Sequence, residues 1–143
     1  MQDPHCHTSS IEVAVPAATA FEIMADGIKQ GDWAWGSFHR KEVEPGIYSG
    51  TSVFDGGETL VRLKVNRENF TVDYEVGRTK DKMVFRNHSR VIPGPLVGRD
   101  ANSCIVSLMS WRLASHTQQQ WEQLCTVHEA EMFLIKGLLE RKK

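Results

Sequence analysis

The chain has 143 residues, of which 41% are hydrophobic and 24% charged, and its formal net charge at pH 7 is −1. This length suits one domain with a hydrophobic core of its own, and the near-neutral charge argues against nucleic acid as the partner, because no basic excess would neutralise phosphates. No apolar run reaches the roughly 18 residues that a membrane span requires, so no integral membrane segment is expected.

The N-terminal residues 1–8 are expected to form a flexible tail ahead of a single domain over residues 9–143. The tail contains the run His5-Cys6-His7. Neighbouring side chains point apart and do not easily converge on one ion, so this run predicts no metal site. Residues 9–15 alternate apolar and polar side chains, which predicts a half-buried strand, and residues 17–25 after Pro16 predict a short helix.

Turn residues divide the middle of the chain into successive strands. The sequence predicts these strands at residues 37–44, 47–54, 59–65, 70–76, 82–91 and 103–114, and it predicts the longest loop at residues 92–102, which are rich in Pro and Gly. Strands joined by tight turns form an antiparallel meander. A twisted sheet of about seven such strands curls and presents a concave face.

The last predicted element is one long helix over residues 115–143. Its apolar stripe recurs every three or four residues and comprises Trp121, Leu124, Cys125, His128, Met132, Ile135, Leu138 and Leu139. Two capping boxes are candidates for its start, Ser115 with Gln118 and Thr117 with Gln120. A helix of this length needs a large concave partner, so the predicted class is α+β, with the curved sheet wrapped around the C-terminal helix and short helices after the first strand.

The opening of the chain resembles a known superfamily. The first strand ends in Val13-Ala14-Val15-Pro16-Ala17, Ala20-Phe21 follows in the helix, and a tryptophan (Trp33 or Trp35) follows the helix-breaking stretch. This pattern is similar to the START-like proteins, also called the Bet v 1-like or SRPBCC superfamily, with polyketide cyclase/dehydrase-like members. The resemblance implies a helix-grip fold with a deep cavity between sheet and helix, and ligands such as lipids, sterols or polyketides. It assigns no catalytic role to any residue here, because the family shares no universal catalytic residue.

The residues expected to line this cavity are mostly apolar. Periodicity and position in the fold select as ligand-binding candidates Trp33, Trp35, Phe54, Leu63, Phe70, Val72, Tyr74, Leu124, His128, Met132 and Ile135. Such a lining suits a small hydrophobic molecule of lipid, polyketide or aromatic type. Binding of such a molecule is therefore the leading hypothesis.

Two alternatives stay open beside this hypothesis. A cyclase/dehydrase-like enzyme would use acid and base groups inside the cavity, for which the candidates are His128, Tyr74 and Glu131. A protein-interaction module would instead have a collapsed cavity and an exposed apolar patch. Converging polar groups inside the cavity would favour the enzyme, and an almost wholly apolar cavity would favour a carrier.

Strand parity sets two further expectations. In residues 82–91 it puts Arg86, His88 and Arg90 on the solvated face, while an inward Arg86 would indicate an anionic ligand group; the facing of Arg62 is left open. Residues 103–114 are apolar on both faces, so the outer face of this strand is expected to be covered by the N-terminal tail or by a second subunit, which makes a homodimer possible.

The cysteines and the known catalytic motifs add mainly exclusions. The chain has three cysteines in an odd, widely spaced set and no apolar signal-peptide centre near its start. Both features fit a reduced, cytoplasmic compartment. No spacing typical of a metal, nucleophile-elbow or phosphate-loop motif occurs, so neither a metal nor a cofactor is expected.

Overall fold

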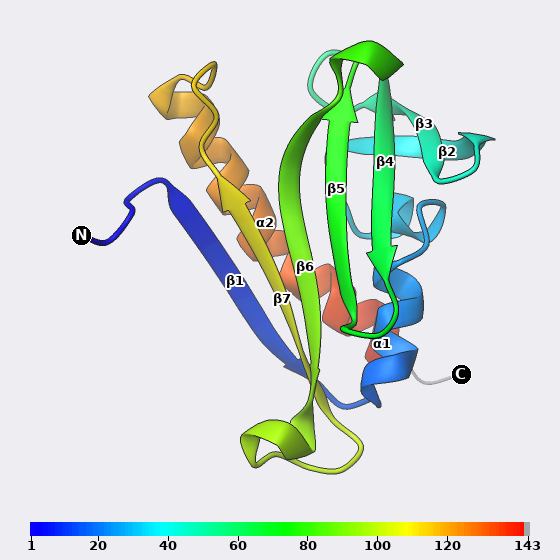
Figure 1. Ribbon diagram of the computed structural model, residues 1–143, viewed down its shortest axis with the longest axis vertical. Helices are drawn as coiled ribbons and strands as arrows, with labels where there is room; N and C mark the ends of the chain where they lie inside the picture. Colours follow the sequence, from blue (N-terminus) through cyan, green and yellow to red (C-terminus); the bar gives the residue numbers. More distant parts are fainter. Residues whose placement is uncertain (142–143) are drawn as a thin grey trace.

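One curved antiparallel sheet holds all seven strands of the structure, in the order β1-β7-β6-β5-β4-β3-β2 (Figure 1). The structure is a computed structural model that describes residues 1–141. The strands are β1 (Cys6–Val13), β2 (Ser37–Glu44), β3 (Ile47–Ser52), β4 (Glu58–Asn66), β5 (Thr71–Gly77), β6 (Val84–Pro93) and β7 (Cys104–Trp111). The predicted meander is therefore confirmed, and its last strand, β7, pairs with β1, which forms one edge of the sheet.

Two α-helices pack on this sheet. They are α1 (Ala17–Met24) and α2 (Gln118–Glu140), and short 3-10 turns lie at η1 (Lys29–Asp32), η2 (Lys80–Lys82) and η3 (Gly94–Val97). In Figure 1 α2 runs diagonally along the sheet, and α1 lies beside its lower end. The predicted α+β class and the order of its elements are confirmed. In the described part of the chain, no helix is both long and apolar enough to cross a membrane.

The ends of several elements differ from the sequence expectation, and those of β1 and α2 bear on the site. β1 begins at Cys6 and not at residue 9, so Cys6, His7 and Thr8 pair with β7 and do not belong to a tail. Residues 6–13 thus lie alongside β7 in the plane of the sheet and do not cover its outer face. Helix α2 begins after Thr117, and the predicted last residues, 142 and 143, lie outside the described residues.

The second of the two predicted capping boxes starts α2. The Thr117 hydroxyl accepts a hydrogen bond from the backbone N–H of Gln120 (3.1 Å), and the Gln120 side chain accepts one from the N–H of Thr117 (2.9 Å). Two backbone donors that the first helical turn leaves free are satisfied in this way. Ser115 lies outside the helix.

The core fills only one end of the space between sheet and helices. Its fully buried side chains come from β1, α1, the middle of the sheet and the C-terminal half of α2, and include Val13, Phe21, Met24, Val72, Val91, Val106, Leu108 and Ile135. The predicted inward residues Leu63 and Tyr74 are buried as well, whereas Val65, near the end of β4, is 38% exposed. Phe70 precedes β5 in a left-handed turn (φ 55°) and packs on Phe21.

Helix α2 is fixed to the β1 edge of the sheet by polar contacts along its length. Ser9 donates to Glu129 (2.6 Å), Lys136 donates to the carbonyl of Glu12 (2.7 Å), and the N–H of Ala14 donates to Glu140 (2.7 Å). At the other edge, β2 carries two register shifts against β3, and such bulges bend a strand and increase its twist. Figure 1 shows β2 and β3 crossing at a steep angle to β4 and β5. The sheet thus bends away from the N-terminal half of α2.

Candidate functional site

A cavity of about 710 Å³ lies where the sheet bends away from α2. This volume is typical of small-molecule sites, which span roughly 300 to 1,000 Å³. Its apolar lining consists of Trp33, Ala34, Val61, Val76, Leu124, Val127 and the ring of Phe54. Its polar lining comes from η1, from β2 to β6 and from residues 115–131, and includes Gln30, Ser37, Arg40, Ser52, Asp55, Thr59, Arg78, Arg86, Asn87, His116, Gln123, His128 and Glu131.

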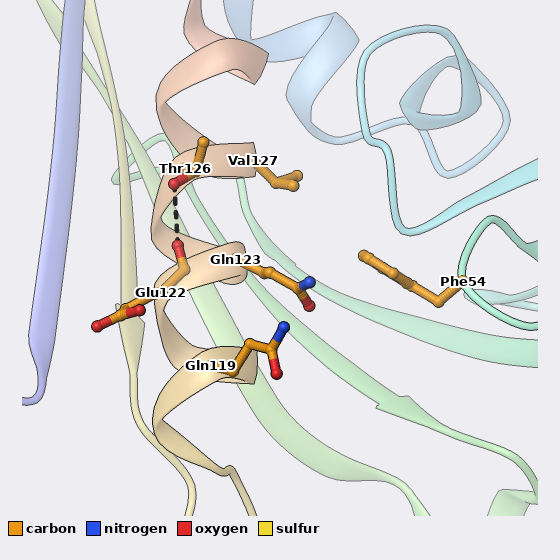
Figure 2. Close-up of a pocket in the computed structure, with 6 residues that line it drawn as sticks. All are labelled: Phe54, Gln119, Glu122, Gln123, Thr126 and Val127. Carbon is orange, nitrogen blue, oxygen red and sulfur yellow. Dashed lines mark hydrogen bonds between the residues drawn. The ribbon is translucent and has the colours of Figure 1, made fainter.

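Phe54 marks the entrance of this cavity. Phe54, Gln123 and Val127 also line a shallow outer groove of about 410 Å³ against α2, together with Gln119, Glu122 and Thr126. Figure 2 shows Phe54 reaching from the loop after β3 toward Gln123 and Val127 on α2. The side chain of Phe54 is 68% exposed. The outer groove and the cavity therefore meet at this ring.

The cavity wall combines apolar side chains with more polar residues than the sequence analysis expected. Four of the predicted ligand-binding residues line it, namely Trp33, Phe54, Leu124 and His128. Leu63, Val72, Met132 and Ile135 are buried in the core, Phe70 packs against the core, and Trp35 is 47% exposed. Alternation along a strand identifies the inward face but not which end of that face meets a filled core. Whether the four lining residues contact a ligand stays a prediction.

Arg40 extends into the cavity from a bulge that sequence parity does not reveal. Phe38 pairs with Thr51 and Lys41 pairs with Ser49, so His39 and Arg40 together oppose Gly50. His39 takes a left-handed conformation (φ 54°), which is uncommon for a residue other than glycine. A bulge of this kind re-aims the neighbouring side chain. Arg40 is not among the site residues predicted from the sequence, because no glycine or proline in the strand signals the bulge.

The Arg40 guanidinium is largely buried and has few hydrogen-bond partners. Its Nη1 donates to the side-chain oxygen of Gln30 (2.5 Å), and its Nε is buried with no hydrogen-bond partner among the described residues. Burial lowers the pKa of Arg40 to about 10, so the group still carries its charge at neutral pH. Within residues 1–141, no carboxylate forms an ion pair with it.

Two further donors that line the cavity lack partners in the same way. The indole Nε1 of Trp33 and the hydroxyl of Ser37 are buried with no hydrogen-bond partner in the described part of the chain. Each residue is only 1% exposed. An unsatisfied buried polar group costs about 1–3 kcal/mol, and such groups are rare in folded proteins. Three of them in residues 33–40 thus form a cluster that requires an explanation.

Glu131 lies on the inner face of α2 and is 3% exposed. Its carboxyl oxygen accepts a hydrogen bond from the backbone N–H of Trp35 (3.1 Å). Burial raises the pKa of Glu131 to about 8, although the Trp35 hydrogen bond and the charge of Arg40 act in the opposite direction. At neutral pH this carboxyl group is therefore mainly protonated, and it can donate a hydrogen bond or a proton.

His128 lies one helical turn before Glu131 and also lines the cavity. Its Nδ1 is 2.8 Å from the hydroxyl of Ser110. Burial lowers the pKa of His128 to about 4, and the nearby side chains of His7 and Arg86 lower it further. The imidazole is therefore neutral at pH 7 and can accept a proton.

Arg86 lines the cavity, which corrects the parity prediction. Tyr74 pairs with Asn87 but Glu75 pairs with Phe85, so Arg86 is the extra residue of a second bulge. Its guanidinium lies 2.7 Å from the Nε2 atom of His116, and burial lowers its pKa. From the sequence, an inward Arg86 was expected to indicate an anionic group on the ligand.

The remaining charged residues of these strands face away from the cavity. His88 contacts Asp73 (2.6 Å), and Arg62, whose facing the sequence left open, pairs with Glu75 (2.9 Å). Arg90 is exposed. The solvated face predicted for His88 and Arg90 is therefore consistent with the structure.

Tyr74 is placed in the core and not on the cavity wall. Its hydroxyl donates to the carbonyl of Met24 (2.8 Å) and lies 3.1 Å from the hydroxyl of Ser89. The side chain is 0% exposed, and burial raises its pKa far above the ordinary value. Of the three catalytic candidates, only His128 and Glu131 line the cavity.

Comparison with known proteins identifies the fold. The chain is similar to a START superfamily protein from Mycobacterium smegmatis, with 13% identity over 95% of this chain and 97% of the other and a TM-score of 0.71. It is also similar to the Zhui aromatase/cyclase from Streptomyces sp. R1128, with 18% identity over 95% of this chain and 93% of the other and a TM-score of 0.65. A structure of norcoclaurine synthase from Thalictrum flavum, in complex with dopamine and hydroxybenzaldehyde, matches with 16% identity, 96% and 88% coverage and a TM-score of 0.60.

These matches show the fold, which is the helix-grip fold of the START-like proteins that the opening of the chain resembles. No protein-family model matches the chain. No curated protein matches it by sequence either. At these identities the likeness establishes the fold, and fold alone does not establish function.

Proposed function

We propose that this protein binds a small organic molecule, with an apolar or aromatic body and at least one oxygen-bearing group, in the cavity between β2–β6 and α2. The observation that carries the proposal is the combination of volume and chemistry in one place. A cavity of about 710 Å³ has Trp33, Val61 and Leu124 on its wall next to buried donors that no protein group satisfies among the described residues. An apolar pocket with a few placed polar groups is the usual form of a ligand site.

The polar lining narrows the ligand types considered from the sequence. A lipid chain would leave the buried donors of Trp33, Ser37 and Arg40 without acceptors. An aromatic or polyketide-type molecule carries oxygens that could satisfy them. Two similar structures, an aromatase/cyclase and a synthase in complex with dopamine and hydroxybenzaldehyde, agree with this preference. A collapsed, purely structural interior is disfavoured by the volume of the cavity.

Native mass spectrometry of the protein from its own host tests this proposal. We expect a co-purifying aromatic or polyketide-type compound that is lost in Leu124→Trp, because the larger side chain fills the cavity wall. Phe133→Trp is the matched control, since Phe133 on the same helix is 71% exposed and should leave binding unchanged. A protein that carries no compound and binds no member of an aromatic ligand panel would contradict the proposal.

A second candidate function is acid–base catalysis on the bound molecule. It is favoured by one observation, that Glu131 and His128 line the same cavity from one face of α2 in complementary protonation states. In a cyclisation or dehydration, neutral His128 would take a proton from carbon, and Glu131 would give its proton to the carbonyl or leaving hydroxyl oxygen. This pair replaces the His128 and Tyr74 pair considered from the sequence.

Incubation of the protein with the co-purified compound, or with its synthetic precursor, separates the two functions. An enzyme should convert it, for instance with loss of one water, and both Glu131→Gln and His128→Asn should slow the conversion by at least about a hundredfold, as is typical of acid–base groups. Tyr74→Phe should convert at the wild-type rate. Unchanged compound with wild-type protein would leave binding as the function.

A further inference from the structure

We infer that the bound molecule is an organic anion, an aromatic carboxylate, whose carboxylate is held by Arg40, Trp33 and Ser37. The inference rests on the proposed function, because it presumes that the cavity is a ligand site. It adds the charge of the ligand and the place of its charged group, which neither the fold nor the similar proteins supply.

The charged groups on the cavity wall do not balance one another. They are Arg40, Arg78, Arg86, Asp55 and Glu131. Asp55 at the exposed rim pairs with Arg78 (2.5 Å), and its pKa is lowered by the Gly57 N–H and by that arginine, so it stays ionised. Glu131 holds its proton at neutral pH because burial raises its pKa to about 8. Two guanidinium groups, those of Arg40 and Arg86, therefore remain without a carboxylate among residues 1–141.

A cavity with this imbalance is electrostatically complementary to an anion. A guanidinium withdrawn from water without a counter-charge is unfavourable, and a carboxylate is the partner that matches its planar geometry. Both arginines reach the cavity through bulges, one in β2 and one in β6, which turn side chains inward that ordinary pairing would leave outside. The same charge appears inside the cavity from two separate strands.

The unsatisfied donors locate the carboxylate at Arg40 and not at Arg86. The Arg86 guanidinium already contacts His116 at 2.7 Å. The Nε of Arg40, the Nε1 of Trp33 and the hydroxyl of Ser37 are all buried without partners in the described chain. Trp33 meets Tyr74 edge to face at 6.4 Å, and Arg40 lies close enough to Tyr74 and Glu131 to shift their pKa values, so the indole and the guanidinium converge on one region of the interior.

The neighbourhood favours a carboxylate on an aromatic body over a phosphate. The three donors are side chains of residues 33–40, whereas phosphates usually occupy a row of backbone N–H groups in a glycine-rich loop or at a helix N-terminus. Val61, Val76 and Leu124 line the same cavity and would contact an apolar ring. The ligand therefore has its charge near η1 and β2 and its apolar body between β4, β5 and α2.

A comparison of acids with their neutral amides tests the inference. Benzoate, naphthoate and anthracene carboxylate are titrated against the wild-type protein by calorimetry at pH 7, each beside its carboxamide and beside inorganic phosphate. We expect at least one acid to bind about tenfold or more tightly than its amide, because only the acid carries a negative charge that can pair with the Arg40 guanidinium. Arg40→Gln should bring acid and amide to equal affinity, and Arg62→Gln, on the outer face, should retain the difference.

Ser37→Ala provides a second readout that does not depend on Arg40 variants folding. Loss of an unsatisfied buried hydroxyl should raise the melting temperature of the ligand-free protein and weaken the acid several-fold, whereas a merely structural hydroxyl would lower the melting temperature when removed. Amides that bind as well as acids would overturn the anion assignment. Phosphate that competes with the acids would overturn the choice of a carboxylate, and either result would leave ligand binding intact. Binding of no compound, with none co-purifying, would overturn both proposals.

Discussion

At the scale of single residues, the cavity contains titratable groups whose protonation is set by burial. Glu131 and His128 lie a helical turn apart, yet burial shifts their pKa values in opposite directions, to about 8 and to about 4. Both shifts favour the neutral form, because a low-dielectric interior penalises charge of either sign. The folded protein therefore carries two uncharged polar groups on the cavity wall at pH 7.

Glu131 should make stability fall as pH rises. The pKa of Glu131 is about 8 in the folded protein against 4.5 ordinarily. Its contribution to the stability of the fold is therefore fully present below pH 4.5 and is lost as pH rises through about 8. The free energy of unfolding should fall by up to about 1.4 kcal/mol per pH unit in this interval. Urea unfolding of wild type and Glu131→Gln between pH 6.5 and 8 checks this, and a wild-type slope retained in the variant would contradict it.

His128 should have the opposite effect in acid. Its pKa is about 4 in the folded protein against 6.5 ordinarily, so the stability is present above pH 6.5 and is lost as pH falls through about 4. His128→Asn should remove this loss between pH 6.5 and 4. Thermal unfolding measured across this interval, with His39→Asn as the control at an exposed histidine, checks the prediction.

Tyr74 should contribute to stability and not to binding. Its hydroxyl bonds to Met24 and Ser89 inside the core, at 2.8 and 3.1 Å. Tyr74→Phe should lower the free energy of unfolding by about 1–3 kcal/mol, because the partner groups lose a buried hydrogen bond. Ligand affinity, measured at a temperature where the variant is folded, should be unchanged. A tenfold loss of affinity would indicate that Tyr74 contacts the ligand.

At the scale of elements, strand irregularities and helix ends decide where side chains point. The bulges in β2 and β6 turn Arg40 and Arg86 toward the cavity, and the capping box of Thr117 and Gln120 fixes the first turn of α2. Gln123, Leu124 and Val127 follow in the next turns and line the cavity. The start of α2 therefore positions one wall of the site.

Two single substitutions distinguish the capping boxes considered from the sequence. Thr117→Ala should destabilise the protein by about 1 kcal/mol, because the N–H of Gln120 loses its acceptor. Ser115→Ala should change stability by less than about 0.5 kcal/mol, since Ser115 is exposed and outside the helix. Equal effects of the two substitutions in chemical denaturation would contradict this assignment.

At the scale of the whole molecule, the outer face of β7 remains the candidate surface for self-association. Ile105, Met109 and Trp111 are half-buried there, and Trp111 contacts Phe85 with ring centroids 5.5 Å apart. The N-terminal strand lies beside β7 and does not cover its outer face. Of the two covers expected from the sequence, only a second copy of the chain is left to test. Light scattering should show a dimer that Met109→Lys dissociates, and a wild-type monomer at micromolar concentration would exclude it.

Local sequence patterns were sufficient for the elements and for much of the core. Alternation predicted β5 and its buried Val72 and Tyr74, and the three- and four-residue repeat predicted α2 with its buried Met132 and Ile135. These patterns report which face of an element is apolar, and every apolar face must be covered in a folded protein. The order of the elements then restricted the fold to one antiparallel sheet around one helix.

The composition of the site could be predicted only in part. His128, Leu124 and Trp33 were identified because they fall on the predicted inward face of the helix or in the loop that approaches the cavity, and Glu131 was identified only as a neighbour of His128 on the helix. Arg40 and Ser37 were not identified. Arg40 faces the cavity because of a bulge in β2, and Ser37 stands out only because its buried hydroxyl has no partner among the described residues. Strand parity correctly orients a regular strand, but a single extra residue reverses the facing beyond it.

The sequence by itself determined the α+β class, the seven strands and the long helix, because periodicity and turn residues are properties of neighbouring positions. Only the tertiary structure decided that one end of the sheet packs solidly while the other bends away from α2 and leaves a cavity lined by unpaired donors. That outcome depends on sheet curvature and on contacts such as the one between Trp35 and Glu131. Residues so far apart in the chain carry no shared local pattern from which their meeting could be read.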